Sequence, residues 1–527
     1  MMQKWVLPES SEASVFEQIL KQKSITIEQL RSEVDNLPDE ALLFDMEKAS
    51  QRIINALYRK EKIIIFGHDD ADGLTSTYLL YDFLERCGFQ DHHYYIPNRM
   101  TESHGIQDSF VQFVEKGKYK LVITVDNGIV AFEGAEKLNK LGCDVIITDH
   151  HLTYKDQLPV AFAVVNPKRA EDRNPYKMPA GVGMTLLVIR YLARMLKMDV
   201  PEGYYIWTAI GSLADKVPLD GVNHILVRYA LDHFYHMHDK TFNFLLRLTT
   251  DLYTYTEKLS FLNNVAKLFS NGRQDGGDHL IMKFFLADGA EKLEYFRTLD
   301  NMRTEQENSI RQVQNFVSSL IDGHEGIGFI YYDDTDQIPY QLLGMAASQT
   351  TNVLHIPAIY LKNKQDIIVC EGRCGEGFNI VEAFRYCEDT LIQSGGHARA
   401  AGFTMEPANI NLFIDKFNEY LNLNEQKIRD GQIIDISCRI TLEDLNETLW
   451  SQLDLLQPYG MGNPEPIFLI EGIKAPEDLI CYHLEYDTIP LPNNGIYDIV
   501  FQWKSFNGLR VIDYRTAAGN ENKPTNL

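Results

Sequence analysis

Residues 63–73 read Ile-Ile-Ile-Phe-Gly-His-Asp-Asp-Ala-Asp-Gly, so an apolar run passes directly into an acidic one. The run Ile63 to Phe66 is short and rich in β-branched side chains, which is typical of a strand buried on both faces of a parallel sheet. His68, Asp70 and Asp72 would then follow the carboxyl end of that strand. Ligands bind at this edge of open α/β sheets, so the stretch predicts an α/β fold with a binding site just beyond the strand.

Two further apolar runs end in the same way. Residues 121–125 are followed by Asp126, and residues 145–147 are followed after one threonine by Asp-His-His at 149–151. Parallel strands bring such segments to one edge, where carboxylates held close together repel one another unless a cation lies among them. Oxygen and imidazole ligands, with no cysteine at ligand spacing, favour Mn²⁺ or Mg²⁺ over a structural zinc ion. Two such ions could activate a water and stabilise a leaving oxygen, which points to phosphoester hydrolysis.

Five segments of the chain carry a resemblance to a known family. Asp-Ala-Asp-Gly at 70–73, Val-Asp-Asn-Gly at 125–128, Asp-His-His at 149–151 and Ala-Asp-Lys-Val-Pro-Leu at 214–219 resemble the successive motifs of the DHH phosphoesterase superfamily. Gly-Gly-His-Ala-Arg-Ala-Ala-Gly at 395–402 resembles the signature of the DHH-associated domain. Within the superfamily the similarity is to the RecJ family, which the stretches 94–99, 164–168, 180–183 and 458–466 also fit.

The resemblance assigns roles to the residues at the strand ends. It implies metal ligands at Asp70, Asp72, Asp126, His150 and Asp215, with Asp126 bridging two ions. His151 would lie beside the scissile phosphate as a hydrogen-bond donor or a proton shuttle. We expect Asp149 to orient a ligating histidine, as carboxylates behind metal ligands commonly do.

Three residues of the first motif have alternative interpretations. His68 departs from the RecJ pattern, in which many bacterial sequences have an acidic residue. It could still bind metal and change metal preference or substrate choice, or it could only support a neighbouring ligand. Asp72 precedes the helical stretch from Leu74 and could be only the N-cap of that helix. Asp69 is expected to be solvent-exposed.

The glycine-rich segment predicts a contact with a nucleic-acid strand. Consecutive glycines let a backbone approach phosphate closely, and an adjoining helix N-terminus would add N–H groups. In the family this element holds the strand near its 5′ end. The residues assigned to substrate binding are Arg373, Gly395, Gly396, His397, Arg399, Asn98 and Arg99.

Composition sets bounds on these hypotheses. With 527 residues, several domains are expected, and a net charge of −24 excludes a uniformly basic DNA-binding surface. We therefore expect weak, salt-sensitive binding in a local basic groove. No apolar stretch approaches the ~20 residues of a membrane span, no secretory signal is visible, and the seven scattered cysteines read as reduced thiols. These features predict a cytoplasmic protein.

The order of motifs and element patterns predicts a multidomain α/β chain. We expect helices at 46–60, 74–87, 131–141 and 182–197, and a long connecting helix at 291–320. The expected regions are a helical lead-in at 1–45, a parallel-sheet DHH domain at 46–225, a helical insertion and connector at 226–322, a DHH-associated domain at 323–425, and a shortened OB-like β domain at 430–515. The aromatics Phe468, Tyr482, Phe501, Trp503 and Phe506 could stack on bases there or form its core.

The resemblance implies a function, and two alternatives stay open. It implies a 5′-to-3′ exonuclease of single-stranded DNA that releases 5′-mononucleotides by two-metal catalysis, in DNA repair and recombination. A single-strand-binding protein or a RecQ-type helicase would be partners by family. One alternative is a nanoRNase or cyclic-dinucleotide phosphodiesterase, against which the helical insertion and OB-like tail argue. The other is a non-catalytic nucleic-acid-binding scaffold, against which the intact ligands argue.

Overall fold

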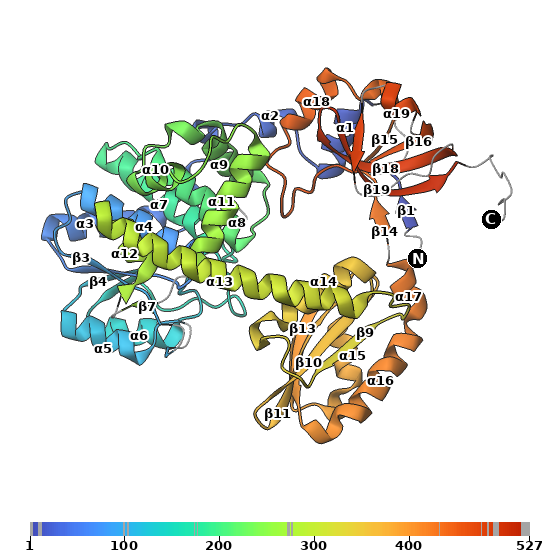
Figure 1. Ribbon diagram of the computed structural model, residues 1–527. Helices are drawn as coiled ribbons and strands as arrows, with labels where there is room; N and C mark the ends of the chain where they lie inside the picture. Colours follow the sequence, from blue (N-terminus) through green and yellow to red (C-terminus); the bar gives the residue numbers. More distant parts are fainter. Residues whose placement is uncertain are drawn as a thin grey trace.

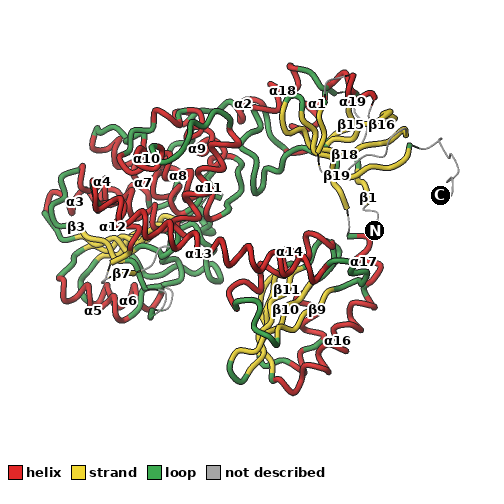
Figure 2. Tube along the Cα trace, viewed as in Figure 1, coloured by secondary structure: helices red, strands yellow, loops and turns green. Residues whose placement is uncertain are grey.

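Three lobes make up the protein, and one long helix crosses between two of them (Figure 1). The computed structural model describes residues 4–8, 13–98, 101–102, 105–172, 174–176, 178–270, 274–275, 278–431, 433–475, 477–481, 484–487 and 495–517. Figure 2 shows a sheet in each lobe, with helices packed around it. Among the described residues, no helix has both the length and the apolarity that crossing a bilayer requires.

The first lobe is built on a parallel sheet, as the apolar runs predict. Its five strands lie in the order β3-β2-β4-β5-β6. Their bounds are β2 (Ile63–Phe66), β3 (His92–Tyr95), β4 (Leu121–Val125), β5 (Asp144–Thr148) and β6 (Ala163–Val165). Phe66 pairs with Thr124, and Thr124 pairs with Ile147, so β2, β4 and β5 end at one edge. The chain order reverses between β2 and β4, which is the point where α/β sheets bind ligands.

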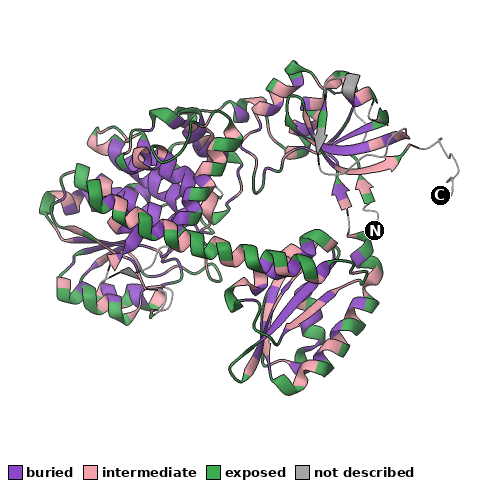
Figure 3. Ribbon diagram, in the orientation of Figure 1, coloured by how far each residue is buried: buried purple, intermediate pink, exposed green. Residues whose placement is uncertain are grey.

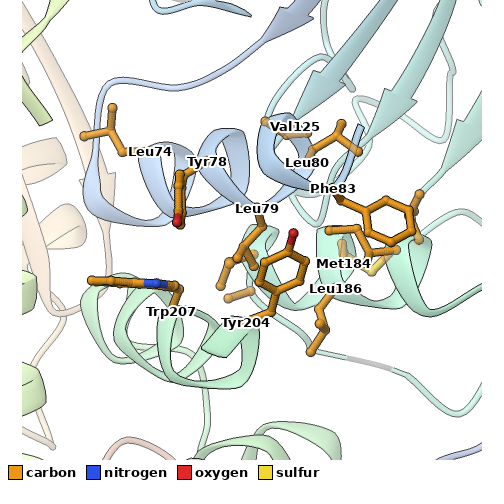
Figure 4. Close-up of a cluster of buried hydrophobic side chains, with 14 of the residues drawn as sticks. Leu74, Tyr78, Leu79, Leu80, Phe83, Val125, Met184, Leu186, Tyr204 and Trp207 are labelled. Carbon is orange, nitrogen blue, oxygen red and sulfur yellow. The ribbon is translucent and has the colours of Figure 1, made fainter. Parts of the chain in front are cut away.

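Helices cover both faces of this sheet. One face packs against α3 (Met46–Arg59), α4 (Ala71–Arg86), α7 (Gly181–Leu196) and α8 (Gly203–Asp215), and the other against α5 (Asp108–Gly117) and α6 (Phe132–Lys140). In Figure 4, Tyr78 and Leu79 of α4 lie close to Tyr204 and Trp207 of α8. The Tyr78 and Trp207 rings meet edge to face with centroids 6.2 Å apart. This packing fixes α4, whose N-cap and first turn carry Asp70 and Asp72 of the acidic motif.

The next segment is mainly helical and ends in the connector. It comprises α9 (Gly221–Asp232), α10 (Lys240–Leu246), α11 (Tyr255–Ser270), β7 (Gln274–Asp275), β8 (Asp278–His279), α12 (Leu280–Leu286) and α13 (Gly289–Ile321). The long helix predicted at 291–320 is confirmed by α13. Leu299 packs in the first lobe and Val317 in the second. Most of α13 between them is exposed (Figure 3).

The second lobe is a five-stranded sheet in the order β12-β13-β11-β10-β9. The strands are β9 (Phe329–Asp333), β10 (Ala358–Lys364), β11 (Ile367–Arg373), β12 (Gln393–His397) and β13 (Ala400–Met405). Its helices are α14 (Leu343–Leu354), α15 (Ile380–Tyr386), α16 (Ile410–Leu423) and α17 (Glu425–Asp430). The glycine-rich segment therefore lies at the edge of a sheet.

The third lobe joins the two ends of the described chain. Its sheet has the order β15-β16-β18-β19-β17. The elements are β15 (Cys438–Ile440), α18 (Glu447–Asp454), β16 (Phe468–Ala475), α19 (Glu477–Cys481), β17 (Glu485–Asp487), β18 (Gly495–Ser505) and β19 (Gly508–Thr516). β1 (Lys4–Val6) pairs with β14 (Ile433–Asp435), and α2 (Ile27–Leu30) leads toward the first lobe.

The N-terminal segment contributes to the core of this third lobe. Phe16 and Ile19 of α1 (Val15–Lys23) are buried in one cluster with Phe468 and Phe501. A nine-residue helix cannot bury its apolar face alone, so it packs on the nearest exposed sheet. Phe468, Phe501 and Trp503 are buried and form core, whereas Phe506 is 41% exposed. Tyr482 lies outside the described residues.

Candidate metal centre

Six candidate ligands from distant parts of the chain meet at the edge of the parallel sheet. His68 and Asp70 follow β2, Asp72 lies in the first turn of α4, and Asp126 and His150 follow β4 and β5. Asp215 is the last residue of α8. Their ligand atoms, together with a ring nitrogen of His151, form three overlapping groups, each within 4.8 Å: His68, Asp70 and Asp126; Asp72, His150 and Asp215; and Asp126, His150 and His151. The structure thus brings together every residue assigned to metal binding.

Asp126 lies at the middle of the cluster. Its Oδ1 is 3.1 Å from His150 Nε2, and its Oδ2 is 3.7 Å from His68 Nδ1. The residue is 2% exposed and has a φ of 59°, a left-handed conformation that few non-glycine residues adopt. A Cβ on Gly181 would lie 2.3 Å from Asp126 Oδ1, so glycine at the start of α7 makes room for the carboxylate. Each Asp126 oxygen faces a different group of ligands, which suits a bridging position.

Asp70 and Asp72 have different local partners. Asp70 is the N-cap of α4: its Oδ1 accepts from Gly73 N–H at 2.8 Å, and its Oδ2 lies 2.8 Å from His68 Nδ1. The alternative that Asp72 is only an N-cap of its own helix is wrong, because α4 begins at Ala71 and Asp72 is already inside its first turn.

Asp72 instead binds the N-terminus of another helix. Its carboxylate accepts from the backbone N–H groups of Gly181 and Val182, at 2.8 and 2.7 Å. These donors lie in the first turn of α7, which has no side-chain cap of its own. Two hydrogen bonds hold the carboxylate so that its Oδ2 lies 4.0 Å from His150 Nε2.

The electrostatics of the cluster fit a bound cation. Burial, and then the carboxylates of Asp70 and Asp215, raise the pKa of Asp72 to about 8. Burial and the neighbouring carboxylates also raise the pKa of Asp126 well above its usual range. Burial lowers the pKa of His150 to about 4, which keeps its ring in the neutral form that binds metals. Among the described residues, Asp126 Oδ1 and His150 Nε2 have no hydrogen-bond partner and lie 3.1 Å apart, and a divalent ion bound by both atoms would satisfy them.

Asp149 orients the second histidine of its motif. It is buried and accepts from the N–H groups of Ile129, His150 and His151, at 2.8, 2.7 and 3.0 Å. Its Oδ1 also lies 2.8 Å from His151 Nδ1. The hydrogen bond with Asp149 raises the pKa of His151, whose side chain is 52% exposed. Asp149 is predicted to orient a ligating histidine. Its carboxylate contacts the ring of His151, whereas from His150 it accepts only the backbone N–H.

Asp69 is buried, so the prediction of a solvent-exposed position is wrong. It is 8% exposed, and its Oδ1 lies 3.0 Å from Nε2 of His279, which is 0% exposed. His279 comes from the helical segment before the connector, 210 residues along the chain. No local pattern marks His279 as part of this site, apart from its N-cap position before the apolar run of α12.

The residues assigned to substrate binding lie outside the cluster. Gly395, Gly396 and His397 are exposed on β12, the edge strand of the second lobe. No helix follows the segment in the chain: a turn and then β13 follow, forming a hairpin in which Gly396 has a φ of 139°. The N-terminus of α15 adjoins the segment from elsewhere in the lobe, with Ile380 N–H donating to Ala398 O at 2.9 Å. A Cβ on Gly396 would lie 2.5 Å from Ala400 O, so the close approach of β13 at this position requires glycine.

The two arginines assigned to substrate binding in this lobe, Arg373 and Arg399, are each paired with a glutamate. Arg373 Nη1 lies 3.0 Å from Glu371 Oε2, and Arg399 Nη2 lies 2.5 Å from Glu376 Oε1. Asn98 follows β3 in the first lobe and donates its N–H to Glu102 at 2.8 Å. Arg99 lies outside the described residues.

Two family models match the chain. Residues 62–211 match the DHH family, N-terminal domain, and residues 436–481 match the RecJ OB domain. The first match covers the sheet and all of the candidate ligands except Asp215.

Curated proteins extend this similarity over most of the chain. The chain is 30% identical to the single-stranded-DNA-specific exonuclease RecJ of Bacillus subtilis over 81% of its own length and 54% of that protein. It is 28% identical to the Haemophilus influenzae protein of the same name, over 81% of this chain and 77% of that one. The chain therefore spans about half the length of the Bacillus relative.

Solved structures share the fold. A structure of exonuclease RecJ bound to manganese is 26% identical, with a TM-score of 0.57 over 72% of this chain and 95% of that chain. RecJ from Thermus thermophilus in complex with Mn²⁺ is 22% identical, with a TM-score of 0.71 over 99% of this chain and 80% of that chain. The arrangement of lobes is thus that of known proteins.

Proposed function

We propose, from its similarity to RecJ proteins and the two matching family models, that this chain is a RecJ-type, metal-dependent exonuclease that degrades single-stranded DNA from the 5′ end and releases 5′-mononucleotides. The observation that carries the proposal is the Asp126 carboxylate. It is buried between two groups of ligands and has an oxygen without a hydrogen-bond partner among the described residues. Such a carboxylate fits a pair of divalent ions.

The donor set fits Mn²⁺ or Mg²⁺, in a two-ion arrangement. His68, Asp70 and Asp126 would hold one ion, and Asp72, His150 and Asp215 would hold the other, with Asp126 shared. The ions would supply Lewis-acid chemistry, which lowers the pKa of water and stabilises charge on the phosphate during in-line displacement. Imidazole among carboxylate ligands favours Mn²⁺ of the two.

His151 would act on the phosphate rather than on the metal. A carboxylate only accepts hydrogen bonds, so the ring nitrogen Nδ1 that faces Asp149 carries the hydrogen. Because this contact raises the pKa of His151, it favours the doubly protonated ring, whose other N–H can donate to a phosphate oxygen. Lys168, half-buried beside Asp149 and Asp215, adds positive charge to the same side of the site.

The second lobe would hold the strand. The exposed edge of β12 offers backbone N–H groups beside His397 and Arg399, which suits a phosphate backbone. Specificity for DNA, the 5′ polarity and mononucleotide release come from the family. So do a cytoplasmic setting in repair and recombination and partners such as a single-strand-binding protein or a RecQ-type helicase.

A nuclease assay tests the proposal. Release of mononucleotides from 5′-labelled single-stranded DNA is measured with Mn²⁺, beside duplex DNA, short RNA and a cyclic dinucleotide. Asp126→Asn, which removes the shared charge at constant size, should abolish the reaction. Cleavage of dinucleotides alone would instead indicate a nanoRNase or cyclic-dinucleotide phosphodiesterase, and no cleavage of any substrate would indicate a binding scaffold.

A further inference from the structure

A buried hydrogen bond links the helical insertion to the first motif of the metal centre. His279 Nδ1 accepts from the N–H of Ile281 at 3.2 Å, which leaves the ring hydrogen on Nε2. Nε2 therefore donates to Asp69 Oδ1 at 3.0 Å. Both side chains are nearly or fully buried, so the tautomer of His279 and the direction of the bond are set by the surrounding structure.

Asp69 lies between two candidate metal ligands. Its neighbours His68 and Asp70 contact each other, with Nδ1 and Oδ2 2.8 Å apart, and both belong to the group that includes Asp126. The chain bends at Asp69 and Asp70, directly before α4. The hydrogen bond to His279 fixes Asp69 in this bend, and so fixes the backbone from which His68 and Asp70 reach the metal centre.

The segment that carries His279 is anchored at two further points. Asp278 accepts from the Tyr94 hydroxyl of β3 at 2.7 Å and from the His279 N–H at 2.7 Å. Phe285 of α12 stacks on Tyr78 of α4, with ring centroids 4.0 Å apart. The insertion therefore contacts β3, the loop that carries the first motif, and the helix that follows this loop.

We propose that His279 is a positioning residue for the metal centre, which orients His68 and Asp70 through its hydrogen bond to Asp69. This inference rests on the proposed function, because it assumes that His68 and Asp70 bind a divalent ion. It assigns the helical insertion a role in metal affinity as well as in the core. His279 belongs to none of the groups of candidate ligands, so it would act on the metal centre through Asp69.

Mn²⁺ titration of the full chain, followed by the electron paramagnetic resonance signal of free Mn²⁺, tests the proposal without an activity readout. His279→Leu removes the donor and should weaken one of the two Mn²⁺ sites about tenfold. His279→Gln keeps an N–H donor and should bind Mn²⁺ within about twofold of wild type. Nuclease activity of His279→Leu should recover as Mn²⁺ is raised.

Tyr94→Phe is the matched control. It cuts the neighbouring anchor to Asp278 and leaves the hydrogen bond between Asp69 and His279 in place, so it should lower thermal stability and leave Mn²⁺ affinity unchanged. A folded His279→Leu with wild-type affinity, or an equal loss of affinity in Tyr94→Phe, would overturn the inference. If His279→Leu does not fold, Asp69→Ala replaces it. This variant breaks the same hydrogen bond but leaves a neutral imidazole buried without its partner, rather than a carboxylate. It should weaken one Mn²⁺ site about tenfold as well, and wild-type affinity would overturn the inference.

The two failures are distinguishable. A wild-type chain that binds no Mn²⁺ removes the proposed function and this inference with it. A wild-type chain that binds two Mn²⁺ ions, beside variants that bind them equally well, removes only the positioning role of His279.

Discussion

At the scale of single residues, the metal centre depends on a close contact between Asp126 and a glycine. Gly181 lies at the first position of α7, where its backbone N–H binds Asp72 and its missing side chain leaves space for Asp126. Gly181 thus positions two candidate ligands, Asp72 and Asp126, which follow different strands of the sheet. The helix itself would form as well or better with alanine at this position, because alanine has the higher helix propensity.

Gly181→Ala should separate the needs of the helix from those of the site. The new Cβ would lie within 2.5 Å of Asp126 Oδ1, Cβ and Cγ, so the carboxylate must move. We expect Mn²⁺ affinity and nuclease rate to fall by at least about tenfold, as for losses of ligand orientation. Gly183→Ala, on the same helix, meets only Pro179 Cβ at 3.3 Å and should retain both. Equal Mn²⁺ affinity in the two variants would contradict the expectation.

At the scale of secondary-structure elements, the β12–β13 hairpin combines an exposed backbone edge with one arginine, Arg399, whose charge is partly neutralised. Its edge strand is exposed along its whole length. Arg399, at the turn, pairs with Glu376, and the pair is largely exposed to solvent. Such pairs contribute about 0–1 kcal/mol, so a DNA phosphate can displace the glutamate at little cost.

Glu376→Gln should therefore strengthen the binding of single-stranded DNA. Removing the competing carboxylate leaves Arg399 available to phosphate, and we expect the dissociation constant to fall about two- to fivefold. The dependence of affinity on salt should also steepen by about one phosphate contact. Fluorescence anisotropy with a labelled oligonucleotide in Ca²⁺, which avoids turnover, measures both. Glu406→Gln, an exposed glutamate of the same lobe, changes the net charge equally and should have a smaller effect.

At the scale of the whole molecule, a loop of the third lobe packs beside the last candidate ligand. Leu219 N–H donates to Met461 O at 2.7 Å, four residues after Asp215. Asn463 closes that loop by donating to Leu456 O and Pro458 O, at 2.7 and 3.0 Å. The third lobe therefore supports the end of the segment that positions Asp215.

Gly462→Ala should disturb the metal centre from a distance. Gly462 has a φ of 70°, and its Cβ would lie 2.6 Å from Pro218 Cβ. Gly472 also has a φ of 70° but faces open space, so Gly472→Ala has the same backbone strain of about 1–2 kcal/mol without the clash. We expect the nuclease rate to fall severalfold in Gly462→Ala alone. Similar rates in the two variants would show that the loop does not act on Asp215.

A second contact between the first and third lobes, made by His224, should weaken as the pH falls. His224 on α9 is buried, and its Nε2 lies 2.9 Å from Gln457 O. Burial, and then the charge of Arg228, lower the pKa of His224 to about 4. Because the unfolded value is about 6.5, the folded state resists protonation, and its stability is fully present above that pH and is lost as the pH falls toward 4.

Hydrogen exchange of the loop around Gln457 measures this effect between pH 7 and 5. Exchange, corrected for its intrinsic rate, should increase as the pH falls. In His224→Gln the increase should be smaller, which separates His224 from Asp454, whose pKa is raised by burial and shifts stability in the opposite direction. Identical pH profiles would exclude His224 as the titrating group.

Local pattern was sufficient for the parallel strands, the long connector and the position of acidic residues at strand ends. The β-branched run before His68 and the helical spacing of 291–320 are properties of short segments, so they can be read without knowing the fold. Strand order in a parallel sheet then brings Asp70, Asp126 and His150 to one edge. The existence of an acidic and histidine site is therefore a consequence of the sequence.

Contacts between distant segments decided the rest. Asp69 binds His279, Asp72 binds the start of α7, and α1 joins the core of the third lobe, and each contact spans a hundred residues or more. The segment Gly-Gly-His at 395–397 has no apolar side chains, so no hydrophobic periodicity indicates whether it forms a strand or leads into a helix. Its pairing with β13 makes it an edge strand. Burial and hydrogen-bond partners belong to the packed molecule, because the residues that supply them are neighbours only in space.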